Sequence, residues 1–137
     1  TGLSGTFWDL RFDPFSDFLG APQSGSLGAW CLTQTGLYYT SNILTPSPSW
    51  TLANTLSPGV SHGHVRPSIS GQGVVYVDWV NDPAGAFASQ VYAARLSNYG
   101  ATIDDSDTLG TANNGYGSIG FDIDAYGSDE MLVGARE

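Results

Sequence analysis

The two histidines of the chain, His62 and His64, are the residues whose type and spacing most readily suggest a metal site. Side chains two positions apart on a strand project from the same face, so both imidazoles could reach one ion. Zinc also requires a third and usually a fourth ligand at suitable spacing, and the neighbouring sequence offers none. We therefore interpret the pair as part of a solvated loop and expect no metal.

A second group of candidate ligands is the acidic run near the C-terminus, formed by Asp122, Asp124, Asp129 and Glu130. Counting Asp122 as the first position of a calcium loop places Gly127 at the sixth, where such loops need glycine. However, Tyr126 fails as a ligand, and Val133 replaces the bidentate glutamate that closes the loop. A strand with outward-facing acids is the preferred interpretation, and calcium binding by this acidic third stays open.

No catalytic signature is assigned in the sequence. Residues 59–63 match the letters of a Gly-x-Ser-x-Gly elbow and residues 115–120 those of a dinucleotide fingerprint, but neither precedes a predicted helix, which both motifs require, and no phosphate-binding loop is present. Paired carboxylates are the chemistry of glycoside hydrolysis, but acidic turns also occur without catalysis. We assign no catalytic, cofactor-binding or metal-binding residue and expect that the protein is not an enzyme.

Aromatic residues make up 12% of the chain and suit either a packed core or a binding surface. The four tryptophans and most tyrosines fall in predicted strands, so we expect most of them in the core. Tyr99 and Tyr116 fall in predicted loops. These two tyrosines are the candidate surface contacts, for a sugar face or a protein interface.

The composition indicates one all-β domain, residues 1–137, with many turns. Hydrophobic residues are 41% of the chain, charged residues only 12%, and there is no lysine. The net charge of −9 disfavours binding to a phosphate backbone, so no nucleic-acid partner is expected. No apolar run is long enough to span a membrane. Cys31 is the single cysteine, which rules out an internal disulfide, and its apolar neighbours indicate a buried thiol.

Short strands alternate with turns along the whole chain, and no segment has a helical apolar stripe. Residues 67–80 are predicted to form a short strand at 67–70, a glycine-flanked turn at 71–73 and an almost continuously apolar strand at 74–80 that is buried on both faces. Residues 57–66 are predicted to be a connection, and residues 97–117 an acidic loop with one short strand near 101–103. The remaining predicted strands cover residues 6–12, 29–33, 37–40, 50–52, 90–96, 119–124 and 131–135.

A strand–turn–strand unit recurs three times, with anchor residues Phe12, Ile69 and Ile123 separated by 57 and 54 residues. A near-constant period of this size, made only of strands, favours the blades of a β-propeller. We place the first repeat at about 6–56, the second at about 65–104 and a partial third at about 116–137. A β-sandwich is the alternative architecture.

Two propeller families resemble parts of this chain. The segments 12–15, 29–33, 36–42 and 49–51 are similar to a blade of the sialidase-type or BNR propellers, whose Ser-x-Asp-x-Gly-x-x-Trp motif is partly kept by Ser41 and Trp50. Asn42 replaces the aspartate of that motif. Residues 66–73 resemble the opening of TolB-type blades, with Gln72 where aspartate is usual. Both resemblances support a fold more than a function.

The sialidase resemblance would imply an arginine cluster that grips a substrate carboxylate, together with a tyrosine nucleophile and an acid. The chain has four arginines, and nothing in the sequence places them together. We therefore keep a glycan-active propeller of the sialidase-like glycoside hydrolase type, or a sugar-binding lectin, as the alternative function.

The predicted repeats amount to about two and a half blades, whereas closed propellers have about four to eight. An incomplete ring exposes strand edges, so we expect first that the chain is a segment of a larger propeller, and second that self-association or a protein partner completes the ring. The first hypothesis is a non-enzymatic structural or recognition module of a secreted, surface, virion or filament assembly, with no membrane insertion and with a glycan as a further partner.

Overall fold

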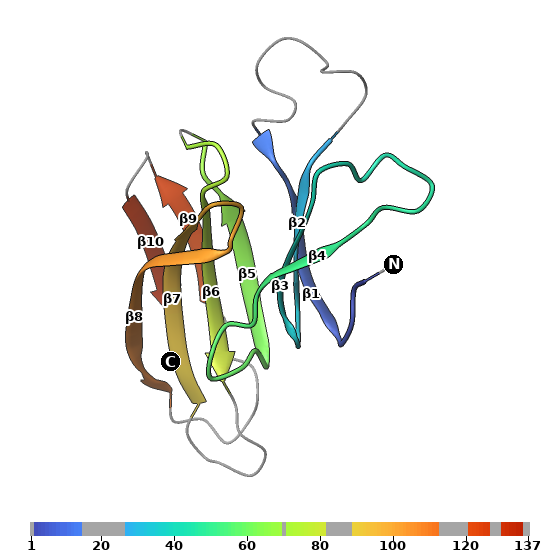
Figure 1. Ribbon diagram of the computed structural model, residues 1–137. Coiled ribbons are helices and arrows are strands. Elements are labelled where there is room, and N and C mark those ends of the chain that lie inside the picture. The colour runs from blue at the N-terminus through green and yellow to red at the C-terminus, as the bar shows by residue number, and fades with distance from the viewer. Residues whose placement is uncertain are drawn as a thin grey trace.

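The computed structural model describes residues 2–14, 27–69, 71–81, 89–112, 121–126 and 130–135, and beyond Leu109 it describes the backbone alone. These ranges contain ten strands and no helical element, which confirms the all-β prediction. It follows that no helix in the described ranges is long and apolar enough to cross a membrane. The strands form two four-stranded antiparallel sheets and one hairpin, stacked as successive layers (Figure 1).

The first sheet follows the order of the chain: β1 (Phe7–Phe12), β2 (Ala29–Thr33), β3 (Gly36–Thr40) and β4 (Thr51–Asn54). The predicted hairpin of β2 and β3 is confirmed, with its turn at residues 34 and 35. Gly36 has a φ of +140°, and a Cβ there would lie 2.2 Å from the carbonyl oxygen of Asn54. Glycine is therefore required where β3 begins beside β4.

The second sheet repeats this arrangement with β5 (His62–Pro67), β6 (Val75–Asn81), β7 (Ser89–Ser97) and β8 (Thr102–Ala112). Residues 75–80 of β6 are all buried, which confirms the strand predicted to be covered on both faces. The turn before β6 is also confirmed: Gly73 has a φ of +70°, a conformation that glycine adopts at little cost.

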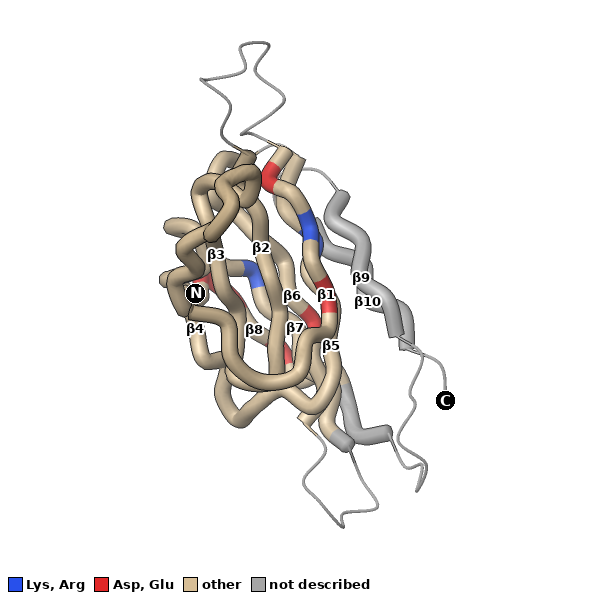
Figure 2. Tube along the Cα trace, turned by 90° about the vertical axis from the view of Figure 1, so that its right-hand side faces the viewer, with Lys and Arg blue, Asp and Glu red and all other residues tan. Residues whose placement is uncertain are grey.

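The third layer is an antiparallel hairpin of β9 (Phe121–Tyr126) and β10 (Glu130–Ala135), close to the two strands predicted there. Strand β9 contacts β5 and β6, and β5 also contacts β1. The first strands of the two sheets and of the hairpin therefore lie side by side, in the order β1, β5, β9. Figure 2 shows β1 next to β5.

The main hydrophobic core lies between the two sheets. It is made of Trp30, Leu32, Leu37, Leu56, Val60, Val65, Val75, Val77, Trp79, Ala94 and Leu96. Trp8, Tyr39 and Tyr92 pack against its margin while partly exposed. Burial of this apolar surface is the principal force that holds the two layers together.

Three secondary-structure predictions were wrong. Residues 62–66, predicted to be part of a connection, belong to β5, because pairing with β6 overrides the weak strand propensity of His-Gly-His. Of the short strand predicted at 67–70, the described residues include only Pro67 in a strand, because the turn begins at Ser68, whose Oγ accepts from the backbone N–H of Gly71. Residues 102–112, predicted to be mostly loop, form the eleven-residue strand β8. Strand β8 is the outer strand of its sheet, and residues 102–109 are exposed, so its polar sequence lacks the apolar alternation of a covered strand.

Candidate functional site

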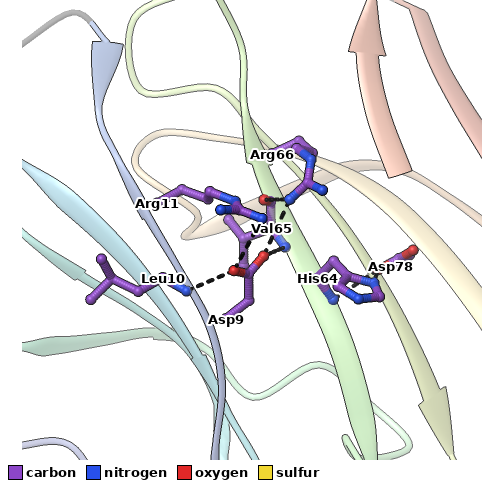
Figure 3. A network of polar contacts seen from close by, with 7 residues as sticks. All are labelled: Asp9, Leu10, Arg11, His64, Val65, Arg66 and Asp78. Atoms are coloured by element: carbon purple, nitrogen blue, oxygen red, sulfur yellow. Dashed lines mark hydrogen bonds and ion pairs between the residues drawn. The ribbon is translucent and has the colours of Figure 1, made fainter. Parts of the chain in front are cut away.

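A cluster of charged residues lies where β1 passes beside β5. Figure 3 shows Asp9 of β1 pointing across to Val65 and Arg66 of β5, with Arg11 next to it. We call Asp9, Arg11, Val65 and Arg66 the inter-sheet junction. Because β1 belongs to the first sheet and β5 to the second, this junction is a polar bridge between the layers.

Both carboxylate oxygens of Asp9 accept hydrogen bonds, and each also lies near an arginine guanidinium. Oδ1 accepts from the backbone N–H of Leu10 at 2.9 Å and lies 3.4 Å from Nη2 of Arg11. Oδ2 accepts from the backbone N–H of Val65 at 2.9 Å and from Nη1 of Arg66 at 3.3 Å. Arg66 Nη1 also donates to the carbonyl oxygen of Val65 at 2.9 Å.

Burial makes the contacts of Asp9 structurally important. The side chain of Asp9 is 11% exposed, that of Arg66 22%, and that of Arg11 44%. A carboxylate with so little access to water requires compensating donors, and the Val65 amide and Arg66 supply them from the other sheet. Arg11 remains well solvated, so its ion pair contributes less.

The bulge in β1 explains how Asp9 reaches the junction. The register of β1 against β2 shifts between Phe7 and Asp9, so Trp8 is the extra residue. Trp8 packs against the core, and its ring lies 5.1 Å from that of His62 in an edge-on arrangement. The shift aligns Asp9 with Leu32, on the face of the sheet that meets β5.

A second polar pair lies inside the second sheet. Asp78 of β6 is fully buried and accepts from the backbone N–H of His64 at 2.8 Å. The same oxygen, Oδ1, lies 3.2 Å from Nδ1 of His64 (Figure 3). The pair therefore ties β5 to β6 through side chains as well as through the ladder.

The histidines thus lie on a strand, and the prediction of a solvated loop was wrong. Their rings are 5.3 Å apart in an edge-on arrangement. Burial lowers the pKa of His62, and the neighbouring His64 lowers it further. Within the described residues no group of three or more His, Cys, Asp or Glu side chains has the geometry of a metal site. The acidic run of residues 122–130 lies beyond the described side chains.

The structure also brings together two arginines that the sequence left apart. Arg11 and Arg66, 55 positions from each other, both contact Asp9. Arg95 lies elsewhere, on β7, where it pairs with Asp104 of β8. The only sequence signal for this convergence was the similar place of the two arginines near the ends of β1 and β5.

Tyr99 lies in the turn between β7 and β8, with a φ of +53° and 37% of its surface exposed. Its ring lies 4.9 Å from that of Tyr39, and its hydroxyl accepts from Nε2 of Gln72 at 3.2 Å. The other predicted contact, Tyr116, lies outside the described residues. Of the four tryptophans, Trp30 and Trp79 are buried in the core.

Cys31 is fully buried, as its apolar neighbours predicted. Burial raises the pKa of its thiol from 9.0 to about 11, and the negative charge of Asp9 raises it as well. Thiol reactivity depends on the thiolate, so Cys31 is an inert core residue at neutral pH.

Comparisons with known proteins found no match to this chain among family models, curated proteins or solved structures. Functional inference therefore rests on the chain's own geometry.

Proposed function

We propose that this chain is a non-enzymatic β-propeller-type module that serves structural assembly or recognition. In this proposal the two sheets are successive blades, and the β9–β10 hairpin opens a third. The setting proposed is a secreted, surface, virion or filament assembly. A partner that completes the sheet stack is part of the proposal.

The observation that carries the proposal is the repeated meander. Each four-stranded sheet uses four consecutive strands, and the chain passes to the next layer only after the fourth. Propeller blades have this connectivity, whereas Greek-key sandwiches pass strands between their two sheets. The side-by-side position of β1, β5 and β9 also supports the proposal, because each of these strands opens its own layer.

The inter-sheet junction supports a structural role for the charges near these first strands. Asp9 accepts three hydrogen bonds, two of them from the other sheet, and forms an ion pair with Arg11. Such a bridge fixes the relative position of adjacent sheets, which is what a stacked module requires.

The alternative is a glycan-active propeller or a sugar-binding lectin. Two features favour it: the guanidinium groups of Arg11 and Arg66 converge on one point, and the ring of Tyr99 is partly exposed. Arginine pairs recognise carboxylates, and aromatic rings stack on sugars.

A glycan array and a glycoside-hydrolase screen on the purified chain separate the two functions. We expect no turnover from the wild-type chain. Turnover that disappears in Arg11→Ala while the fold is retained would replace the proposal with the alternative. Glycan binding that Tyr99→Ala abolishes, without turnover, would instead identify a lectin.

The blade arrangement has a separate test, an experimental structure of the chain in its assembled state. We expect successive sheets to rotate in one sense about an axis next to β1, β5 and β9. Sheets that close on each other as a two-layer sandwich, with the hairpin at an edge, would contradict the propeller-type arrangement.

A further inference from the structure

The β9–β10 hairpin has half as many strands as the other two layers. In the sheets, the pairs β1–β2 and β5–β6 are each followed by two more strands, which add beside β2 or β6. Strand β10 is the second strand of its layer, as β2 and β6 are of theirs, and among the described strands it pairs only with β9. The edge of β10 away from β9, which no described strand pairs with, is therefore where the repeated architecture would add two strands.

The sequence of β10 does not protect this edge. The outer strand of the first sheet, β4, is only four residues long, and the outer strand β8 of the second carries the exposed acids Asp104, Asp105 and Asp107. Short length and charge both discourage further pairing at an edge. Strand β10 has six residues, Glu-Met-Leu-Val-Gly-Ala, with one charge at its start and no proline or lysine. A two-stranded hairpin is also of marginal stability by itself.

We propose that β10 pairs antiparallel with β10 of a second copy of this chain, which forms a four-stranded sheet in the order β9-β10-β10-β9. This inference rests on the proposed function, in which the hairpin opens a third four-stranded layer. The product has the strand number and the antiparallel pairing of the other two sheets.

A second copy fits this edge because of symmetry. A two-fold axis perpendicular to a sheet makes two identical edge strands antiparallel, so the contact is self-complementary and closed. The axis places one residue opposite itself, and a register centred on Leu132 or Val133 overlaps most of the strand. Both registers keep the two Glu130 residues at opposite ends of the pair. A parallel pairing in register would place them next to each other, at an electrostatic cost.

The mass in solution gives the first test. Sedimentation equilibrium of the whole chain is expected to give twice the 14.4 kDa of one chain. Proline substitutions at Leu132 and Val133 probe the edge, because alternate N–H groups of an edge strand face outward and a proline removes one donor. We expect one of the two variants to be a folded monomer. Leu52→Lys on the outer strand β4 is the matched control and should remain a dimer.

Cysteine cross-linking locates the contact. Four variants with one added cysteine are oxidised in turn: Met131→Cys, Leu132→Cys, Val133→Cys and Gly134→Cys. The cysteine at the two-fold axis should form a disulfide with the same cysteine of the second copy. Leu109→Cys on β8 is the negative control, and the buried thiol of Cys31 is protected. A chain that stays monomeric up to millimolar concentration, or a dimer in which no β10 cysteine cross-links, overturns the pairing. Neither result bears on the blade arrangement, which an experimental structure of the chain in its assembled state tests separately.

Discussion

At the scale of single residues, Asp9 connects parts of the chain that are far apart in sequence. Its bond to the Val65 amide joins residues separated by 56 positions. The carboxylate is almost buried and is held by donors from both sheets, so removal of its charge leaves groups on each side without their acceptor.

We predict that Asp9→Ala lowers the free energy of unfolding by about 2–3 kcal/mol, because buried hydrogen bonds to a charged acceptor are lost. Arg11→Ala should cost less than about 1 kcal/mol, since Arg11 is largely solvated. Urea denaturation with unchanged m-values measures both changes. Equal costs for the two variants would show that Asp9 does not bridge the sheets.

His62 should give the protein a pH dependence in the acidic range. Its pKa in the folded chain is below the ordinary value of 6.5, through burial and through His64. As the pH falls below 6.5, the unfolded chain binds a proton that the folded chain resists, so the free energy of unfolding decreases. The effect is modest because the ring is partly exposed. His62→Gln should flatten the pH profile of the melting temperature in this range, and an unchanged profile would contradict the assignment.

Cys31 should give a second pH dependence, in the alkaline range. Its pKa rises from 9.0 to about 11 on folding, mainly through burial. Below pH 9 the thiol is protonated in both states, and between pH 9 and 11 only the unfolded chain loses the proton. Stability should therefore decrease as the pH rises through this interval. Cys31→Ala should remove this decrease in stability with pH. A thiol reagent should react with the native protein only as fast as the protein unfolds locally to expose Cys31.

At the scale of elements, β5 shows why the His62-Gly63-His64 segment needs its glycine. A Cβ on Gly63 would lie 2.4 Å from the carbonyl oxygen of Asp78 and 2.7 Å from Cδ2 of Leu32. Leu32 belongs to the first sheet, so Gly63 lies at a close approach of the two layers. The glycine is a packing requirement between two histidines that face the other side of the strand.

We predict that Gly63→Ala destabilises the fold by about 1–3 kcal/mol, because the extra methyl group must displace backbone or a core leucine. Gly59→Ala is a control for the effect of removing a glycine, since a Cβ there meets nothing within 4 Å, although its φ of +134° adds backbone strain. Thermal unfolding of both variants gives the comparison. A Gly63→Ala protein as stable as wild type would mean that the sheets can separate at this point without cost.

Strands β5 and β8 show where sequence patterns stop being informative. The hairpin of β2 and β3 and the covered strand β6 were predicted because their apolar residues report burial directly. The polar strand β8 is held by its ladder with β7, which leaves no apolar pattern in its own residues. Strand β8 therefore forms because β7 lies beside it, and which strands lie side by side is decided by the fold and not by the residues of β8 alone.

At the scale of the whole molecule, the layers repeat in the order of the chain. The first sheet, the second sheet and the hairpin stack in sequence, and the first strand of each lies beside the next. The period of the anchor residues predicted a repeat of this size, but gave no indication that Asp9, Arg11 and Arg66 would meet between layers. The sequence predicted that Tyr99 lies in a loop, whereas its packing against Tyr39 emerges only from the folded chain.

The sequence by itself determined the all-β class, the buried strand β6, the β2–β3 turn and the burial of Cys31. These features depend on residues close together in the chain: alternation, β-branched runs and glycines in turns. Only the tertiary structure decided that His62 and His64 lie on a strand, that β8 exists and that two arginines share Asp9. Strands β5 and β8 depend on pairing with β6 and β7, and the Asp9 cluster depends on contacts between residues about 55 positions apart. Both are set by how strands and sheets pair and pack, which leaves no local trace in the sequence.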